Sequence, residues 1–286
     1  MLSGDASTST TTSTTTANAS AAVPCILVFA AREKARSFAR AAFPRKRARA
    51  IVVRNAIEFR DAVRRDLVDA AVIDLASTGN DTWTIAALAP DYPSVPFFGL
   101  LPLRTSDGES TARAASLGFA DVLCEQVDEA CARDLIAPLT YTARFARALA
   151  EPPAALGLET ETQRRTWSAI VQQAGRPVTT SALASGIGVT REHLSRNFAR
   201  GNGANLKRVI DLVRLISAAE LSKNPGYDVR DVAAVLGFAS SSHLAVTTQR
   251  IASTRPASLS GLRAVDLVER FVQGRTRSRV AGNRSL

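Results

Sequence analysis

The chain of 286 residues is 46% hydrophobic, carries three cysteines and has a formal net charge of +10 at pH 7. This length and apolar content allow two domains that each bury a core, whereas three cysteines are too few for a disulfide framework and lack the spacing of a metal site. Without a basic leader, an apolar signal core or an apolar run of about 18 residues, the sequence favours a reduced, cytoplasmic protein with no membrane contact, metal or cofactor.

The basic charge is confined to the C-terminal part of the chain. Residues 1–159 hold 17 Lys and Arg against 18 Asp and Glu, whereas residues 160–286 hold 19 against 8. Phosphates attract clustered cations whatever the base sequence, so this division is typical of a nucleic-acid-binding module joined to a nearly neutral domain. A solvated basic surface is the alternative explanation.

The N-terminal part begins with a Ser/Thr-rich tail, residues 1–22, that has no hydrophobic period and is expected to be disordered. From Val23 onward, short apolar runs alternate with amphipathic stretches. The apolar runs read "CILVFA", "AIVV", "AAVIDLA", "VPFFGLL" and "DVLCE". This alternation predicts an α/β domain over residues 23–150, with a parallel five-stranded sheet covered by helices on both faces.

The end of this domain is predicted from a helical stretch followed by prolines. Residues 128–150 are expected to form one helix, and Pro152 and Pro153 break the pattern within a linker over 151–159. Strand signals then disappear. We expect an all-α domain over residues 160–262 and a basic helix and tail over 263–286.

The order of strands and helices in the first domain resembles a response-regulator receiver domain, with Asp74 at the position of the phosphoacceptor. Phosphoryl transfer to a carboxylate needs a divalent cation and a further cation on the phosphoryl oxygens. The residues that supply this chemistry in receivers are replaced by Ala30, Ala31, Leu101, Pro102, Glu125 and Gln126. We therefore expect a degenerate, non-phosphorylatable receiver in which Asp74 only forms hydrogen bonds, and which serves for dimerisation or ligand sensing. The alternative is a response regulator that is switched by phosphorylation of Asp74.

The second domain begins with a helix-turn-helix pattern. Thr179 or Thr180 can cap a first helix, Gly186 and Gly188 allow a tight turn, and Thr190 can cap a second helix. Leu194 and Phe198 form the buried face of that second helix. Its polar outer face is typical of a recognition helix in the DNA major groove.

A second copy of the pattern follows after about fifty residues. A first helix starts at Val229, Gly237 and Phe238 form the turn, and a second helix spans 240–250 with Leu244 inside. Between the copies, residues 205–226 read as one amphipathic helix ended by Pro-Gly. One rigid helix would hold two recognition helices at the separation of successive major-groove segments.

Residues 165–262 resemble the DNA-binding domain of the AraC/XylS family of transcription regulators. The resemblance is carried by "EHLSRNF", Gly203, "RLISAAEL", "VAAVLGFASSSHL" and Pro256. It departs at Leu244, Val246 and Thr248, where the family has Phe, a basic residue and Phe, and at Ser253, where the family has Gly. We therefore expect the first unit to dominate sequence reading.

The resemblance implies base contacts from the outer faces of both recognition helices. The expected base-contacting residues are Arg191, Glu192, Ser195, Arg196, Ser241, Ser242 and Ala245. The expected phosphate-contacting residues are Arg200, Lys207, Arg208, Gln249, Arg250 and Arg255. The predicted function is sequence-specific binding of double-stranded DNA by a homodimer, with RNA polymerase as a further candidate partner.

Two alternative functions remain open. A non-specific architectural DNA-binding protein would use the same basic surface without reading sequence. A small catalytic α/β unit is disfavoured, because the sequence shows no nucleophile-base pair, no Gly-rich phosphate loop and no histidine before His193.

Overall fold

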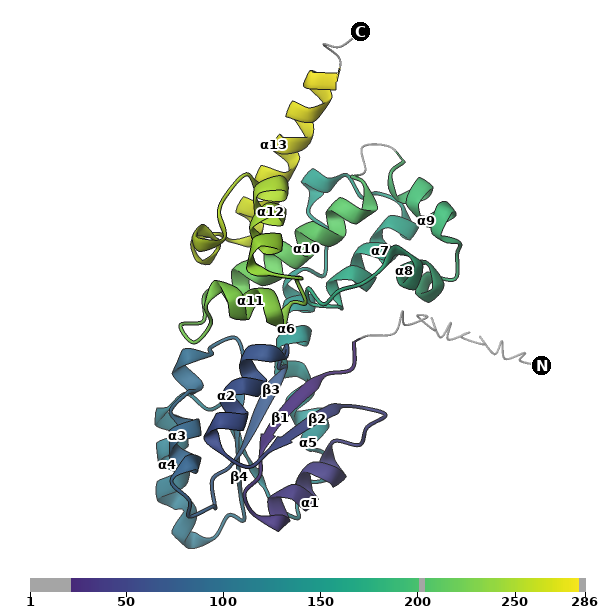
Figure 1. Cartoon of the computed structure of the whole chain (residues 1–286). Coiled ribbons are helices and arrows are strands. Elements are labelled where there is room, and N and C mark those ends of the chain that lie inside the picture. The colour runs from purple at the N-terminus through teal and green to yellow at the C-terminus, as the bar shows by residue number, and fades with distance from the viewer. Residues whose placement is uncertain (1–21, 201–203, 283–286) are drawn as a thin grey trace, which may run out of the picture.

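The computed structural model describes residues 22–200 and 204–282. The Ser/Thr-rich segment up to residue 21, Gly203 and the last four residues lie outside the described residues. Figure 1 shows an α/β domain below a helical domain, with α6 between them.

The α/β domain is built on five parallel strands. They are β1 (Cys25–Phe29), β2 (Arg49–Val53), β3 (Ala70–Asp74), β4 (Phe97–Leu101) and β5 (Asp121–Cys124). The strand order is β2-β1-β3-β4-β5, and every paired strand runs parallel to its neighbour. This is the doubly wound order of flavodoxin-like sheets. The predicted fold class is confirmed.

Helices cover both faces of the sheet because its central strands are apolar on both sides. One face packs against α1 (Glu33–Ala42) and α5 (Ala132–Ile136). The other face packs against α2 (Ala56–Arg65), α3 (Asp81–Ala86) and α4 (Gly108–Ser116). Short 3-10 turns lie at Ala89–Asp91 and Thr105–Asp107.

The single helix predicted over residues 128–150 is wrong. The chain instead forms α5, a 3-10 turn at Ala137–Leu139, and a separate helix α6 (Tyr141–Ala148). Pro138 cannot donate a helical hydrogen bond, and Thr140 starts the new helix by accepting a hydrogen bond from Ala143 N at 3.3 Å. This break directs α6 toward the helical domain.

The helical domain is organised around α10 (Leu206–Leu221), which is buried along most of its length. Before it come a 3-10 turn at Ala154–Leu156, α7 (Glu161–Val171), α8 (Thr180–Ile187) and α9 (Arg191–Phe198). After it come α11 (Val229–Val235), α12 (Ser241–Ala252), a 3-10 turn at Pro256–Gly261 and α13 (Ala264–Gly282). The all-α prediction is confirmed. The boundary at residues 151–159 stays a prediction.

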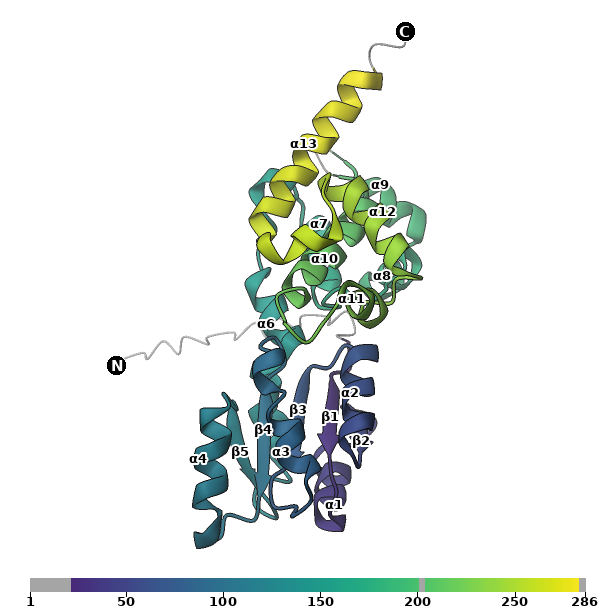
Figure 2. The same cartoon turned by 60° about the vertical axis from the view of Figure 1, so that its left-hand side comes forward.

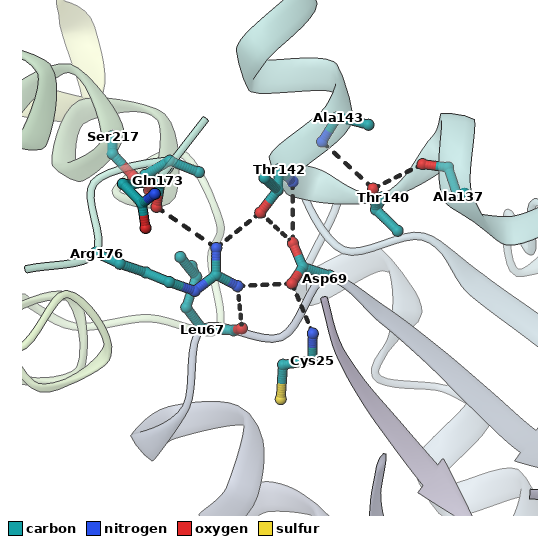
Figure 3. Close-up of polar contacts among 11 residues, drawn as sticks. Cys25, Leu67, Asp69, Ala137, Thr140, Thr142, Ala143, Gln173, Arg176 and Ser217 are labelled. Atoms are coloured by element: carbon teal, nitrogen blue, oxygen red, sulfur yellow. Dashed lines mark hydrogen bonds and ion pairs between the residues drawn. The ribbon is translucent and has the colours of Figure 1, made fainter. Parts of the chain in front are cut away.

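The two domains share one continuous hydrophobic core. At the junction shown in Figure 3, the buried Asp69 carboxylate accepts hydrogen bonds from Arg176 Nη2 (2.6 Å), Thr142 N (3.0 Å) and Cys25 N (2.8 Å). Arg176 belongs to the loop between α7 and α8, whereas Asp69 directly precedes β3. This polar cluster therefore links the sheet to the segment that leads into the first helix-turn-helix unit.

Two tyrosines extend the junction toward α11. Tyr227 donates a hydrogen bond to Val63 O at 3.0 Å, and Tyr92 donates one to Gly226 O at 3.1 Å. The two rings pack edge to face with centroids 4.9 Å apart. A side chain at position 226 would collide with the Tyr92 ring, since a Cβ there would lie 2.4 Å from it. The α/β domain is thus closely packed against the second helix-turn-helix unit.

Candidate nucleic-acid interface

The first helix-turn-helix unit consists of α8 and α9. Thr179, and not Thr180, caps α8 by accepting a hydrogen bond from Ala182 N at 3.1 Å. The helix ends at Gly188, whose φ of 80° lies in the left-handed region that favours glycine. Thr190 then caps α9 through His193 N at 3.2 Å. Local sequence alone therefore places both ends of this turn.

Helix α9 buries one face and exposes the other. Leu194 and Phe198 are fully buried, and the Gln163 side chain of α7 donates a hydrogen bond to Phe198 O at 3.0 Å. Of the four predicted base-contacting residues of this helix, three are exposed and one is half-buried. They are Arg191, Glu192 and Arg196, with Ser195 half-buried. The recognition face predicted for the first unit is accessible.

The second unit consists of α11 and α12, and its turn is fastened by a residue from α10. Asp228 caps α11, and Gly237 adopts a left-handed φ of 65°. Arg214 of α10 donates to Leu236 O at 2.8 Å and lies 3.7 Å from the centroid of the Phe238 ring. Arg214, one of the residues that carry the family resemblance, therefore has a structural position at this turn.

Helix α12 also has distinct inner and outer faces. Ser240 caps it through His243 N at 3.1 Å. Leu244, Thr247, Thr248 and Ile251 point inward. The predicted base-contacting residues occupy the outer part, with Ser242 exposed and Ser241 and Ala245 half-buried. Val246 stands 65% exposed among them, although sequence reasoning treated it only as the loss of a basic residue.

The central helix α10 packs directly against α12 and against α7, and α7 and α8 in turn pack against α9. Figure 2 shows α9 and α12 on one side of the helical domain and α13 on the other. In Figure 1, α9 and α12 lie beyond α8 and α11, away from the α/β domain. Both recognition helices therefore lie on the same side of the helical domain.

The six predicted phosphate-contacting residues differ in their surroundings. Arg200, Lys207, Gln249 and Arg255 are exposed. Arg250 is exposed but forms an ion pair with Asp211 at 2.7 Å, and Arg208 is half-buried with its guanidinium 5.1 Å from the Phe271 ring centroid. Two of the six side chains thus have partners within the chain.

In the α/β domain, the Asp74 carboxylate forms hydrogen bonds and an ion pair with an arginine. Asp74 is fully buried, its Oδ1 accepts from Arg32 Nε (2.8 Å) and Nη2 (2.5 Å), and its Oδ2 accepts from Arg32 N (3.1 Å). Arg32 also forms an ion pair with Glu125. Burial lowers the pKa of Arg32, but its hydrogen bonds to Asp74 and Glu125 outweigh burial and raise that pKa above its ordinary value.

The sequence predicts the loss of acidic residues at Ala30 and Ala31, but Arg32, the next residue in the chain, was not among the predicted site residues. Its position directly after the missing acidic pair was the available signal. Within residues 22–200 and 204–282, no group of three or more His, Cys, Asp or Glu side chains is arranged to hold a metal ion.

The match to known families falls on the helical domain. Residues 161–260 match the family model of a helix-turn-helix domain. This domain is of the AraC type and belongs to a class found in DNA-binding transcription regulators. None of the helices in the described part of the chain is long and apolar enough to span a bilayer.

Two solved structures are similar to this chain at low identity. A response regulator protein from Burkholderia pseudomallei, crystallised with a phosphorylated aspartic acid, a calcium ion and citrate, is 18% identical; the match covers 62% of this chain and 99% of that chain, with a TM-score of 0.34. Full-length FixJ from B. japonicum is 14% identical over 75% of this chain and 97% of that chain, with a TM-score of 0.35. Because both scores are low, the fold of the α/β domain rests on its strand order and register. No curated protein matches the sequence.

Proposed function

We propose that this protein is a sequence-specific, double-stranded-DNA-binding transcription regulator of the AraC family. The observation that carries the proposal is the pair of recognition helices, α9 and α12, which carry exposed polar residues and lie on one side of the helical domain. The helix-turn-helix match over residues 161–260 and the basic charge of the C-terminal part support it.

The exposed side chains suggest how each helix reads bases. Arg191 and Arg196 have the donor fork that pairs with a guanine edge, and Glu192 has an acceptor for the cytosine amino group. On α12, Ser241, Ser242 and Ala245 offer only short side chains. The first unit therefore contributes most of the direct readout, as the sequence predicts.

The receiver-like domain supports this function without phosphoryl transfer. Asp74 Oδ1 accepts hydrogen bonds from the Arg32 guanidinium and Oδ2 accepts one from the Arg32 backbone N–H, so Arg32 lies where a divalent cation and a phosphoryl group would have to approach. The domain serves for dimerisation or ligand sensing, the active species is a cytoplasmic homodimer, and RNA polymerase is a further partner. We propose no catalytic role for either domain.

Selection of bound sites from a random duplex library tests the proposal. The intact protein at physiological salt is expected to enrich one motif. Arg196→Ala is expected to weaken binding by about 1 to 3 kcal/mol and to relax preference at one base pair. Arg45→Ala, an exposed arginine between α1 and β2, is the control with the same change in net charge.

The architectural alternative gives a different result in the same experiment. An unenriched library, with affinity that falls steeply as salt rises, would mean that the helices bind phosphates without reading bases. Equal base preference for wild type and Arg196→Ala would remove Arg196 from the reading surface.

A further inference from the structure

A cavity of about 410 Å³ lies at the junction of the two domains. Its apolar walls include Phe145 from α6, Leu149 directly after α6, and Ile216 from α10. The loop residues Pro93 and Ser94 belong to the α/β domain. This volume is in the range of small-molecule sites, which are mostly apolar with a few convergent polar groups. The cavity is separate from α9, α12 and the Asp74 site.

One polar atom in this wall has no hydrogen-bond partner among the residues that the structure describes. Ser94 Oγ is buried and forms no hydrogen bond to any residue that the structure describes. The backbone around it is well held, because Ser94 N donates to Asn224 Oδ1 at 2.9 Å. A buried hydroxyl without a partner costs free energy, and because Ser94 lines the cavity, rotation about its χ1 angle would bring the hydroxyl to a group that enters the cavity.

A cation lies beside this hydroxyl. Arg144 donates a hydrogen bond to Ser94 O and forms no ion pair with any carboxylate in the described part of the chain. Desolvation at the cavity wall lowers the pKa of Arg144. The other charged residues of the wall, Lys223 and Glu220, pair with each other at 2.6 Å. One positive charge is therefore left for an occupant.

We propose that this cavity binds a small amphipathic monocarboxylate. Its carboxylate pairs with the Arg144 guanidinium and accepts a hydrogen bond from Ser94 Oγ once that hydroxyl rotates toward the cavity. Its apolar body packs against Phe145, Leu149 and Ile216. A planar guanidinium matches a carboxylate in a bidentate manner, and the apolar walls select against ions that have no apolar part. The proposal does not rest on DNA binding.

An occupant would contact both domains at once, because Ser94 belongs to the α/β domain and Ile216 to the central helix α10. Ligand binding would therefore stabilise the packed arrangement of the two domains. This gives the receiver-like domain an input that does not use Asp74.

Ligand-observed NMR on the intact protein, without DNA, tests the proposal with three probes. 1-Naphthylacetate carries both the charge and the apolar body, 1-naphthylacetamide lacks the charge, and acetate lacks the apolar body. We expect 1-naphthylacetate to bind at least about fivefold more tightly than either of the other two, since only it uses both parts of the site.

Two variants and a matched control locate the site. Arg144→Met is expected to abolish the preference for the carboxylate over the amide, and Ser94→Ala to weaken carboxylate binding by at least about threefold. The control is Arg147→Met on the same helix, because Arg147 also donates to a backbone carbonyl, that of Pro138 at 3.2 Å, but does not line the cavity. Thermal melting of each variant checks its fold.

The outcomes decide the proposal without reference to DNA. Binding of 1-naphthylacetate that survives in Arg147→Met and loses its charge preference in Arg144→Met supports it. Absence of binding, equal binding of acid and amide, or equal effects of the two arginine variants overturns it and leaves the cavity to water. Enrichment of a DNA motif is independent of all these results, so failure here leaves the proposed function standing.

Discussion

The Arg176 guanidinium lies 2.6 Å from the Asp69 carboxylate, and this pair joins two segments that are 107 residues apart in the sequence. Asp69 is fully buried, and Arg176 also donates to Thr142 Oγ1 at 2.8 Å. A buried carboxylate that loses its cation is strongly destabilised, because its desolvation is no longer offset.

Arg176→Met is therefore expected to lower the free energy of unfolding by about 3 kcal/mol. Urea denaturation followed by circular dichroism measures this change. The control is Arg40→Met, which removes a surface ion pair with Glu33 at 2.8 Å and is expected to cost less than about 1 kcal/mol. Similar losses of unfolding free energy for both variants would show that the Arg176–Asp69 pair stabilises the protein no more than a surface ion pair does.

Treatment with acetyl phosphate and Mg²⁺ is expected to leave the mass of the protein unchanged. The reason is that Asp74 is fully buried and its Oδ1 is paired with the Arg32 guanidinium, which competes with a metal ion and with an incoming phosphoryl group. Mass spectrometry of the intact protein and of the peptide that contains Asp74 gives the measurement. Stoichiometric phosphorylation of Asp74 would instead support the phosphorylation-switched alternative.

Ser253→Gly is expected to stabilise the protein by about 0.5 to 1 kcal/mol. Ser253 ends α12 with φ of 50° and ψ of 40°, a left-handed conformation that costs a residue with a Cβ more than it costs glycine. The matched control is Ser258→Gly in the 3-10 turn, where φ is not positive and the added chain entropy should destabilise slightly. Thermal or urea unfolding of both variants distinguishes strain from a general effect of glycine.

Val246 is expected to read a thymine methyl group within the DNA motif. Its side chain is 65% exposed on the outer part of α12, and an exposed branched side chain in the major groove fits the C5 methyl of thymine. Replacing each thymine of the selected site by deoxyuridine removes only that methyl. At one position, this replacement should weaken DNA binding by the wild type but not by Val246→Ala.

Val265→Ala serves as the control for that experiment, because Val265 is 49% exposed on α13, away from the recognition helices. The Val265→Ala variant should lose DNA affinity at the same deoxyuridine position as the wild type. If the wild type shows no such position, Val246 does not contact a thymine methyl, even when the motif itself is enriched.

Stability is expected to fall between pH 9 and pH 11 because of Cys25. Burial raises the pKa of its thiol from the usual 9.0 to about 11, so the unfolded chain ionises first as the pH rises. The free energy of unfolding should then decrease by at most about 1.4 kcal/mol per pH unit from this group. Comparison with Cys25→Ala isolates it from the buried tyrosines, whose raised pKa values affect both proteins alike.

Local patterns in the sequence were enough for most elements. The apolar runs predict the sheet because β1, β3 and β4 are buried on both faces, and the cap residues Thr190 and Ser240 fix the starts of both recognition helices. The expected helix over residues 128–150 failed because periodicity continues across Pro138, whereas the backbone hydrogen bonds do not.

The sequence by itself determined the α/β and helix-turn-helix elements, since burial periodicity and capping act within a few residues of each other. Only the tertiary structure decided that Arg32 pairs with Asp74 and that Arg176 pairs with Asp69. It also decided that Ser94 and Arg144 line one cavity between the domains. These contacts join segments far apart in the chain. Such pairings follow from how whole layers pack, and apart from the position of Arg32 after the missing acidic pair, no local pattern of residues indicates them.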